Sequence, residues 1–329
     1  MNGKFKQCAA SLLGLMAVVT MVTMSGCDKK SAAATASPVV QKRAQPLLIQ
    51  HQLGTTTITD VPQRVAVMDM NEADFLDQLN VPFAGMPKDF IPHFLDKYQQ
   101  NHADIADLGG IVQPNMERIH TLKPDLILMT PIQKDHYQEL TQIAPTLYYE
   151  INFNNSEHGH LATIKNHLLT LGKIFNREDL ARSKVAELDA EVNKVRAITK
   201  ERPEKALVVL YNNGAFSNYG VDSRYGFIFS DLGVKPASDD ASTSLHGQPI
   251  SSEFIKRADP DILYIIDRTS VMQHQPVITA AQVTNPLLRA TKAWKNNRVI
   301  FVDADAWYTT GASPTSMYLL MQDVMKGYQ

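Results

Sequence analysis

Short apolar runs alternate with stretches of helical hydrophobic spacing along much of the chain. The run at residues 64–68 precedes a helical stretch at 72–79. The run at 126–129 likewise precedes one at 135–143. Strands joined by helices produce this alternation, and they form largely parallel sheets rather than helix bundles or sandwiches. The pattern therefore predicts an α/β fold.

A weak internal repeat predicts two lobes, each with a mostly parallel sheet flanked by helices. Residues 117–127 and 253–263 share the order Glu-x-Ile, Pro-Asp and apolar run, with the same interval from Glu to Pro. Residues 75–82 and 229–236 form a second matching pair. One match can arise by chance from any helix-turn-strand unit, but two matches indicate a repeated architecture. The length of 329 residues also favours two hydrophobic cores over one.

Residues 177–202 lie between the repeat halves and are predicted to form one long connecting helix. Residues 177–200 contain no Gly or Pro, and their apolar stripe consists of Ala181, Val185, Leu188, Val192 and Val195. Such a helix is roughly 35 Å long, enough to run along both lobes. A surface helix within one domain is the alternative, but the position between the repeats favours a connector. The lobes then span residues 46–176 and 203–329.

The amino terminus has the pattern of an exported lipoprotein. Two lysines precede an apolar run at residues 8–24, which is too short for a permanent membrane span. The Met-Ser-Gly-Cys sequence that ends at Cys27 resembles the bacterial lipobox, in which the cysteine is lipidated and residues 1–26 are removed as a signal peptide. An uncleaved anchor with a chance cysteine is the alternative, but the small residues directly before Cys27 argue against it.

Lipidation of Cys27 predicts a periplasmic protein anchored to the inner membrane. Asp28 resembles the signal that retains such lipoproteins on the inner membrane of a double-membraned bacterium. Residues 27–45 are rich in Ala, Ser and Lys and show no apolar periodicity, which predicts a flexible tether. After cleavage Cys27 is the only cysteine, so no disulfide within one chain and no thiolate metal cluster is expected.

Charge and motifs argue against several classes of function. The net charge is −2 and no Lys or Arg cluster follows the amino terminus, so we expect no nucleic-acid partner. The sequence contains no phosphate-binding loop, dinucleotide glycine fingerprint, serine elbow or His-Glu-x-x-His helix. We therefore expect a protein that is not an enzyme. A lipid-anchored hydrolase using Asp267, Asp303 and His246 is the remote alternative.

Residues that directly follow the apolar runs are the candidates for a site, because ligands bind beyond the carboxyl ends of strands in open parallel sheets. In the second lobe these candidates are Asn212, Arg224, His246, Arg268 and Tyr308. In the first lobe they are Lys134 and Lys88.

Several short segments around these candidates form a specific set. They are residues 212–220, 223–226, 243–247, 267–268 and 307–308 in the second lobe, with 85–88 and 108–125 in the first. Together they resemble the catecholate siderophore-binding proteins of iron ABC importers, which belong to the helical-backbone class, class III, of substrate-binding proteins. The resemblance runs from about Leu47 to the end of the chain. It implies a monomeric lipoprotein that delivers a ferric catecholate siderophore to the transmembrane permease, with no cofactor beyond this Fe(III)-siderophore cargo.

The resemblance implies roles for four candidates. A histidine and a tyrosine at the positions of His246 and Tyr308 can bind iron directly, and arginines at the positions of Arg224 and Arg268 face the catecholates. Physical chemistry supports these roles, because Fe(III) prefers oxygen donors and a tetradentate siderophore leaves two coordination positions for a phenolate and an imidazole. Ferric catecholates are anionic, and guanidinium groups supply both charge and hydrogen bonds to clustered oxygens.

Each of these candidates has a plainer alternative. Arg268 could pair with the neighbouring Asp267 at the surface, His246 could cap a turn, and Tyr308 could pack beside Trp307 as a core aromatic pair. The same fold could also carry haem, a corrinoid or a hydroxamate siderophore. Free zinc or manganese is disfavoured, because the first lobe supplies no clear set of His and carboxylate ligands at its strand ends.

One departure from the family pattern leaves the charge and denticity of the cargo open. Where family members often carry a third arginine after the first-lobe strand, this chain reads Thr-Pro-Ile-Gln-Lys at residues 130–134. Lys134 can supply the charge but not the fork geometry of a guanidinium.

Glu72 and Glu253 open predicted helices near the cavity rims of opposite lobes. The resemblance implies that such exposed glutamates dock on arginines of the permease, one per lobe. The alternative is that each carboxylate only complements the amino terminus of its helix, which contributes roughly 0.3 to 1 kcal/mol.

Overall fold

The computed structural model describes residues 42–99 and 104–329. The predicted signal peptide, Cys27 and most of the predicted tether lie outside the described residues. Strand β1 (Lys42–His51) pairs antiparallel with β2 (Gly54–Asp60), so the folded part begins ahead of its predicted start at residue 46. No helix within the described ranges combines the length and apolar character that a membrane crossing requires.

The first lobe contains a five-stranded parallel sheet in the order β5-β4-β3-β6-β7, which confirms the parallel sheet predicted there. Its strands are β3 (Val65–Val67), β4 (Gly85–Met86), β5 (Ala106–Asp107), β6 (Leu126–Met129) and β7 (Thr146–Tyr148). Its helical segments are α1 (Met70–Gln78), η1 (His93–Tyr98), α2 (Met116–Leu122), η2 (Pro131–His136) and α3 (Tyr137–Ile143). Strands β3 and β6 are fully buried apolar runs, as a sheet covered on both faces requires.

The second lobe contains a six-stranded sheet in the order β11-β9-β8-β12-β13, with β10 beside β8. Its strands are β8 (Lys205–Asn212), β9 (Ala215–Tyr219), β10 (Lys235–Pro236), β11 (Gln248–Ile250), β12 (Ile262–Asp267) and β13 (Val299–Phe301). Strands β8, β10, β12 and β13 are parallel, in agreement with the mostly parallel sheet predicted for this lobe. Strand β9 alone is reversed, because it runs antiparallel to both of its neighbours, β8 and β11, and the sheet is therefore mixed. The cause is a two-residue turn at Asn213 and Gly214, whose φ values of 47° and 90° suit a tight hairpin.

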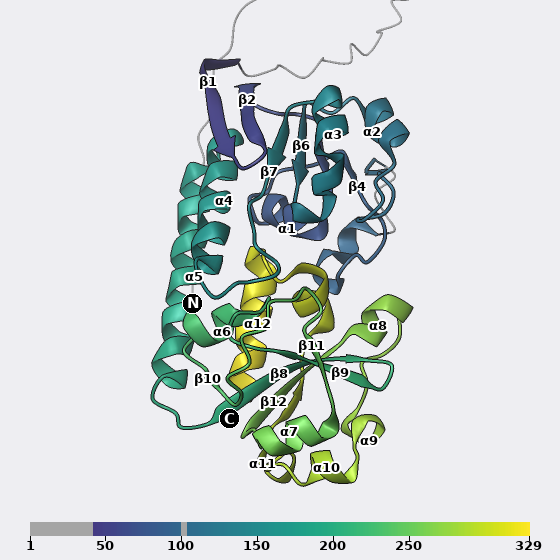
Figure 1. Cartoon of the computed structure of the whole chain (residues 1–329). Coiled ribbons are helices and arrows are strands. Elements are labelled where there is room, and N and C mark those ends of the chain that lie inside the picture. The colour runs from purple at the N-terminus through teal and green to yellow at the C-terminus, as the bar shows by residue number, and fades with distance from the viewer. Residues whose placement is uncertain (1–41, 100–103) are drawn as a thin grey trace, which may run out of the picture. The chain divides into compact units, whose positions relative to one another are not determined.

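Helix α5 (Glu178–Thr199) connects the lobes within the predicted range 177–202. It packs against α4 (His160–Ile174) and α12 (Pro314–Lys326), and Figure 1 shows α4 and α5 side by side. The predicted apolar stripe faces inward, because Ala181, Leu188, Val192 and Val195 are buried. The remaining helical segments of the second lobe are α6 (Gly226–Ser230), α7 (Ser252–Ala258), α8 (Arg268–Gln273), α9 (Ala280–Val283), α10 (Pro286–Arg289), α11 (Lys292–Lys295) and η3 (Asp305–Thr310).

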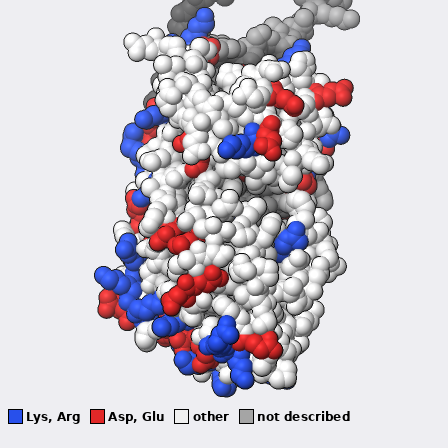
Figure 2. Space-filling view, in the orientation of Figure 1, with Lys and Arg blue, Asp and Glu red and all other residues white. Residues whose placement is uncertain are grey.

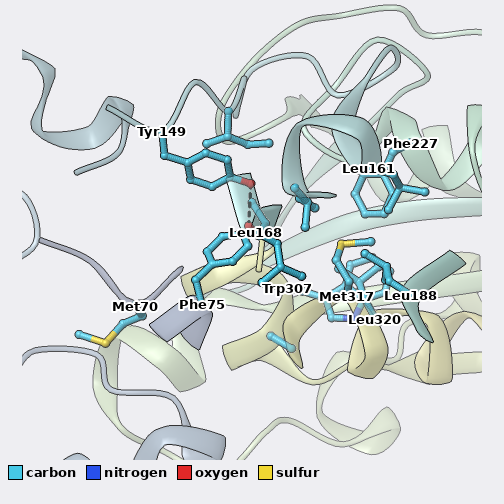
Figure 3. Close-up of a cluster of buried hydrophobic side chains, with 14 of the residues drawn as sticks. Met70, Phe75, Tyr149, Leu161, Leu168, Leu188, Phe227, Trp307, Met317 and Leu320 are labelled. Carbon is cyan, nitrogen blue, oxygen red and sulfur yellow. Dashed lines mark hydrogen bonds between the residues drawn. The ribbon is translucent and has the colours of Figure 1, made fainter. Parts of the chain in front are cut away.

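One hydrophobic cluster extends through both lobes. Figure 3 shows part of it, where Phe75 and Tyr149 of the first lobe lie near Trp307 of the second. Tyr149 Oη donates a hydrogen bond to the Ala312 carbonyl at 2.9 Å, which adds a polar contact between the lobes. The described residues belong to a single compact unit. The two lobes therefore pack against each other through a shared hydrophobic core.

Candidate ligand-binding site

A cavity of about 310 Å³ between the lobes brings together most of the predicted ligand-binding residues. Its second-lobe lining includes Arg224, Leu245, His246, Arg268, Met272, Tyr308 and Thr309. Its first-lobe lining consists of Phe90, Ile111, Val112, Ile132 and Phe153. Cationic, imidazole and phenol groups thus converge on one wall of a partly apolar cavity.

A larger hollow of about 710 Å³ lies along the first-lobe edge that carries α2. One of its arginines, Arg118, is already ion-paired with Asp107. Its described lining residues include no histidine and no tyrosine. The smaller cavity is therefore the better candidate for a ligand-binding site, because the chemically distinctive side chains gather there.

Arg268 and Tyr308 are hydrogen-bonded to each other in the cavity wall. Arg268 Nε lies 2.6 Å from Tyr308 Oη, and Arg268 Nη1 donates to Asn212 Oδ1 at 3.3 Å. The parallel register of β8 and β12 places Asn212 and Arg268 at the same sheet edge, because Asp267 pairs with Tyr211. The guanidinium thus holds the phenol oxygen in place at the cavity wall, and oxygen donors of this kind suit hard metal ions.

Arg224 is largely buried, with 8% of its surface exposed. Its Nη2 donates to the Tyr308 carbonyl at 2.8 Å and to the Thr310 carbonyl at 3.4 Å. Its guanidinium carbon lies 5.7 Å from the centroid of the Tyr308 ring and 5.4 Å from that of Phe153. These contacts hold a permanent positive charge beside the cavity without an ion-pair partner among the described residues.

His246 is exposed at the cavity, and its ring faces that of Tyr308 with centroids 6.3 Å apart and an interplanar angle of 28°. Desolvation lowers the pKa of His246, and the positive charges of Arg268 and Arg224 lower it further. The imidazole is therefore neutral at neutral pH, and a neutral imidazole nitrogen can coordinate a metal.

The π-helical segment η3 presents Tyr308 to the cavity. Its Trp307 is fully buried, and Trp307 Nε1 donates to Asp323 at 2.9 Å. The Trp307 carbonyl accepts a hydrogen bond from Tyr225 Oη at 2.6 Å. Trp307 is thus the core aromatic, and Tyr308 is the partly exposed one. Segments of π-helix are rare and occur frequently at functional sites.

The two first-lobe lysines do not line this cavity. Lys134 is exposed and lines a neighbouring hollow, which shares Ile132 with the cavity. Lys88 Nζ donates to the Tyr98 carbonyl at 2.8 Å. The structure therefore brings together five of the seven predicted ligand-binding residues: Asn212, Arg224, His246, Arg268 and Tyr308.

The prediction of an exposed Glu72 is wrong. Glu72 is fully buried in α1, and its Oε2 lies 2.9 Å from His167 Nε2. Helix α1 is covered because it contacts α4 and α12 as well as its own sheet. A permease arginine cannot reach Glu72 in this structure. Glu253, by contrast, is exposed in the first turn of α7.

The acidic residues of the alternative hydrolase hypothesis have other partners. Asp267 is buried and accepts hydrogen bonds from the Ser270 and Ile278 amides at 3.2 and 2.9 Å, so it caps α8. Asp303 contacts His93 at 2.6 Å, and together with Asp305 they form a possible metal-binding group outside the cavity lining. Asp267 and Asp303 are not among the described residues that line the cavity beside His246.

Sequence reasoning missed the apolar lining of the cavity and one hydroxyl. Apolar residues after strands resemble core residues in a sequence, so Ile111, Val112 and Ile132 carried no distinguishing signal. Thr309 also lines the cavity, and its Oγ1 is buried without a hydrogen-bond partner among the described residues. Only its position next to Tyr308 in the sequence could have indicated it.

Figure 2 shows the charged side chains on one face of the molecule. Lys and Arg are interspersed there with Asp and Glu, and they form no continuous basic surface on this face. The expected absence of a nucleic-acid partner stays a prediction.

Comparisons with known proteins cover both lobes. A family model described as a periplasmic binding protein matches residues 65–306. The chain is 60% identical over 310 residues to the ferric-anguibactin-binding protein FatB of Vibrio anguillarum, which covers 94% of this chain and 95% of FatB. The solved structure of the siderophore-binding protein BauB, bound to a complex between two molecules of acinetobactin and ferric iron, is 69% identical with a TM-score of 0.83, covering 87% of this chain and 99% of BauB. The periplasmic catecholate-siderophore-binding protein VctP of Vibrio cholerae is 28% identical with a TM-score of 0.79, covering 85% and 99%.

Proposed function

The chain belongs to the periplasmic binding protein family, and from that premise we propose that it captures a ferric catecholate siderophore and delivers it to the permease of an ABC importer. One observation carries the proposal. Arg224, Arg268, His246 and Tyr308 come from separate segments and line a single cavity. The named relatives FatB, BauB and VctP are binding proteins for siderophores or ferric siderophores, which supports cargo of the same class.

The chemistry of the cavity suits an anionic ferric chelate. Fe(III) is a hard ion, so the Tyr308 oxygen is a suitable ligand, and the neutral His246 imidazole can take a second position left by a tetradentate siderophore. Arg268 and Arg224 supply positive charge next to these two groups. The protein then contributes capture and orientation without any turnover of the siderophore.

The proposal includes the cellular setting. Cys27 carries the lipid that anchors a monomeric protein to the periplasmic face of the inner membrane. Glu253 supports docking of the second lobe on a permease arginine, because it is exposed at the start of α7. The partner position in the first lobe is unassigned, because Glu72 is buried.

Titration of the protein starting after Cys27 tests the cargo. Ferric tetradentate catecholate, ferric hydroxamate, haem and a corrinoid are added separately while tryptophan fluorescence is recorded. Trp307 directly precedes Tyr308, so we expect saturable quenching at the lowest concentration with the ferric catecholate, and the iron-free ligand serves as the control. Tighter saturable binding of haem, a corrinoid or the hydroxamate would reject catecholate capture.

A further inference from the structure

The first-lobe wall of the cavity is apolar and exposed to solvent. Seven large apolar side chains are exposed in the described part of the chain, and four of them line this one cavity: Val112, Ile132, Leu245 and Met272. Val112 is 68% exposed and Ile132 is 39% exposed, and both belong to the first lobe. Exposed apolar side chains gathered in one place mark a binding surface.

Phe90 of the same wall has an unusual backbone conformation. Its φ of 55° lies in the left-handed region, which is costly for a bulky side chain and persists only where the surrounding structure imposes it. Its ring stacks on that of His274, with centroids 5.9 Å apart and an interplanar angle of 18°. Phe90 therefore brings the first-lobe wall against the second lobe at the margin of the cavity.

The permanent positive charge of the described cavity lining comes from the second lobe alone. Arg224 and Arg268 provide it, and Arg224 already donates to two backbone carbonyls. Lys134 lines the neighbouring hollow, and Lys88 is bonded to the Tyr98 carbonyl. A ligand in this cavity thus meets all of the permanent charge on the second-lobe side, where Leu245 and Met272 also lie, and only hydrocarbon on the first-lobe side.

We propose, building on capture of a ferric catecholate, that the cavity selects complexes with two unlike faces. The second lobe binds the chelating oxygens of a complex of low net negative charge. The first lobe packs Val112 and Ile132 against an apolar or aromatic-ring part of the same ligand. A compact trianionic tris-catecholate complex binds more weakly, because charge placed against this wall loses hydration without gaining a partner.

Competition between two ferric complexes tests this selectivity. The first is a monoanionic complex of a bis-catecholate whose linker carries a phenyl group, and the second is a trianionic complex of a tripodal tris-catecholate. We expect the full protein to bind the first at least about tenfold more tightly. Ile132→Lys should raise the affinity for the trianion relative to the monoanion about tenfold. The trianion carries two more negative charges, and the new lysine attracts both of them.

Ile198→Lys is the matched control, since Ile198 is 37% exposed on α5 and does not line the cavity. Val112→Lys provides a second cavity variant should Ile132→Lys fold poorly. Equal or tighter binding of the trianion by the unaltered protein would overturn the inference. A relative affinity for the two complexes that is the same in the cavity variants as in Ile198→Lys would overturn it too. Failure of both complexes to bind would instead reject the proposed function.

Discussion

Tyr308 and Arg268 act as a pair at the scale of single residues. The 2.6 Å contact between Arg268 Nε and Tyr308 Oη orients the phenol, and the second arm of the guanidinium reaches Asn212. A lysine presents all of its N–H donors from a single nitrogen and cannot hold both partners in this geometry. The pair therefore depends on the shape of the guanidinium as well as on its charge.

Arg268→Lys should lower the affinity for a ferric tetradentate catecholate by about tenfold. Loss of one hydrogen bond to a charged group costs about 1.5–3 kcal/mol, and about 1.4 kcal/mol corresponds to a factor of ten. Fluorescence titration measures the change, with Arg257→Lys on the exposed surface of α7 as the control. An unchanged affinity in Arg268→Lys would show that charge alone holds the ligand.

The sequence predicted the polar second-lobe residues of the site because each follows or flanks a recognisable strand and has few roles in a core. It could not predict the burial of Glu72, since a glutamate in the first turn of a helix has the same pattern whether or not another helix covers it. The partner that makes this burial possible, His167, is 95 positions away in the chain. Such long-range pairs leave no local signal.

At the scale of elements, Asp74 joins α1 to the start of α12. Its Oδ2 accepts a hydrogen bond from the Thr315 amide at 2.8 Å, which caps a helix of the other lobe. Asp74 is fully buried, and desolvation raises its pKa from 3.8 to about 6. The carboxyl therefore binds its proton more tightly in the folded protein than in the unfolded chain.

Asp74→Asn should change how stability depends on pH. Because its pKa is raised, Asp74 binds more protons in the folded protein than in the unfolded chain between pH 4 and 6. The contribution of Asp74 to the stability of the wild-type protein therefore falls as the pH rises through that window. Asp74→Asn lacks this loss, so its unfolding free energy relative to wild type should increase by roughly 2 kcal/mol from pH 4 to pH 7. Urea unfolding at each pH measures the difference. A relative stability that stays constant, or falls, would contradict an ionised and desolvated Asp74.

The elements themselves were predicted unevenly. Helix α5 was predictable because its apolar stripe is long and uninterrupted, and β6 because it is a continuous buried run. The hairpin of β8 and β9 was not predicted although Asn213 and Gly214 form a recognised turn pair, because the alternation of strands and helices elsewhere in the chain favours parallel neighbours. The reversed direction of β9 was therefore not predicted.

For the whole molecule, the two lobes share one hydrophobic cluster and are connected by α5. The repeat in the sequence predicted two lobes of similar build, and both do contain a sheet with parallel strands. It could not predict the shared core, because the packing of α1 against α12 depends on residues far apart in the chain. The cavity walls are thus set by the packing between lobes, which explains why its apolar side was not foreseen.

The charge-transfer band of the bound ferric tetradentate catecholate tests most directly whether the protein itself completes the coordination of the iron. Tyr308→Phe removes the phenol oxygen while keeping the ring, and Tyr211→Phe is the control because Tyr211 does not line the cavity. We predict that the band shifts in Tyr308→Phe and stays in place in Tyr211→Phe. An identical band in wild type and Tyr308→Phe would contradict direct ligation by Tyr308.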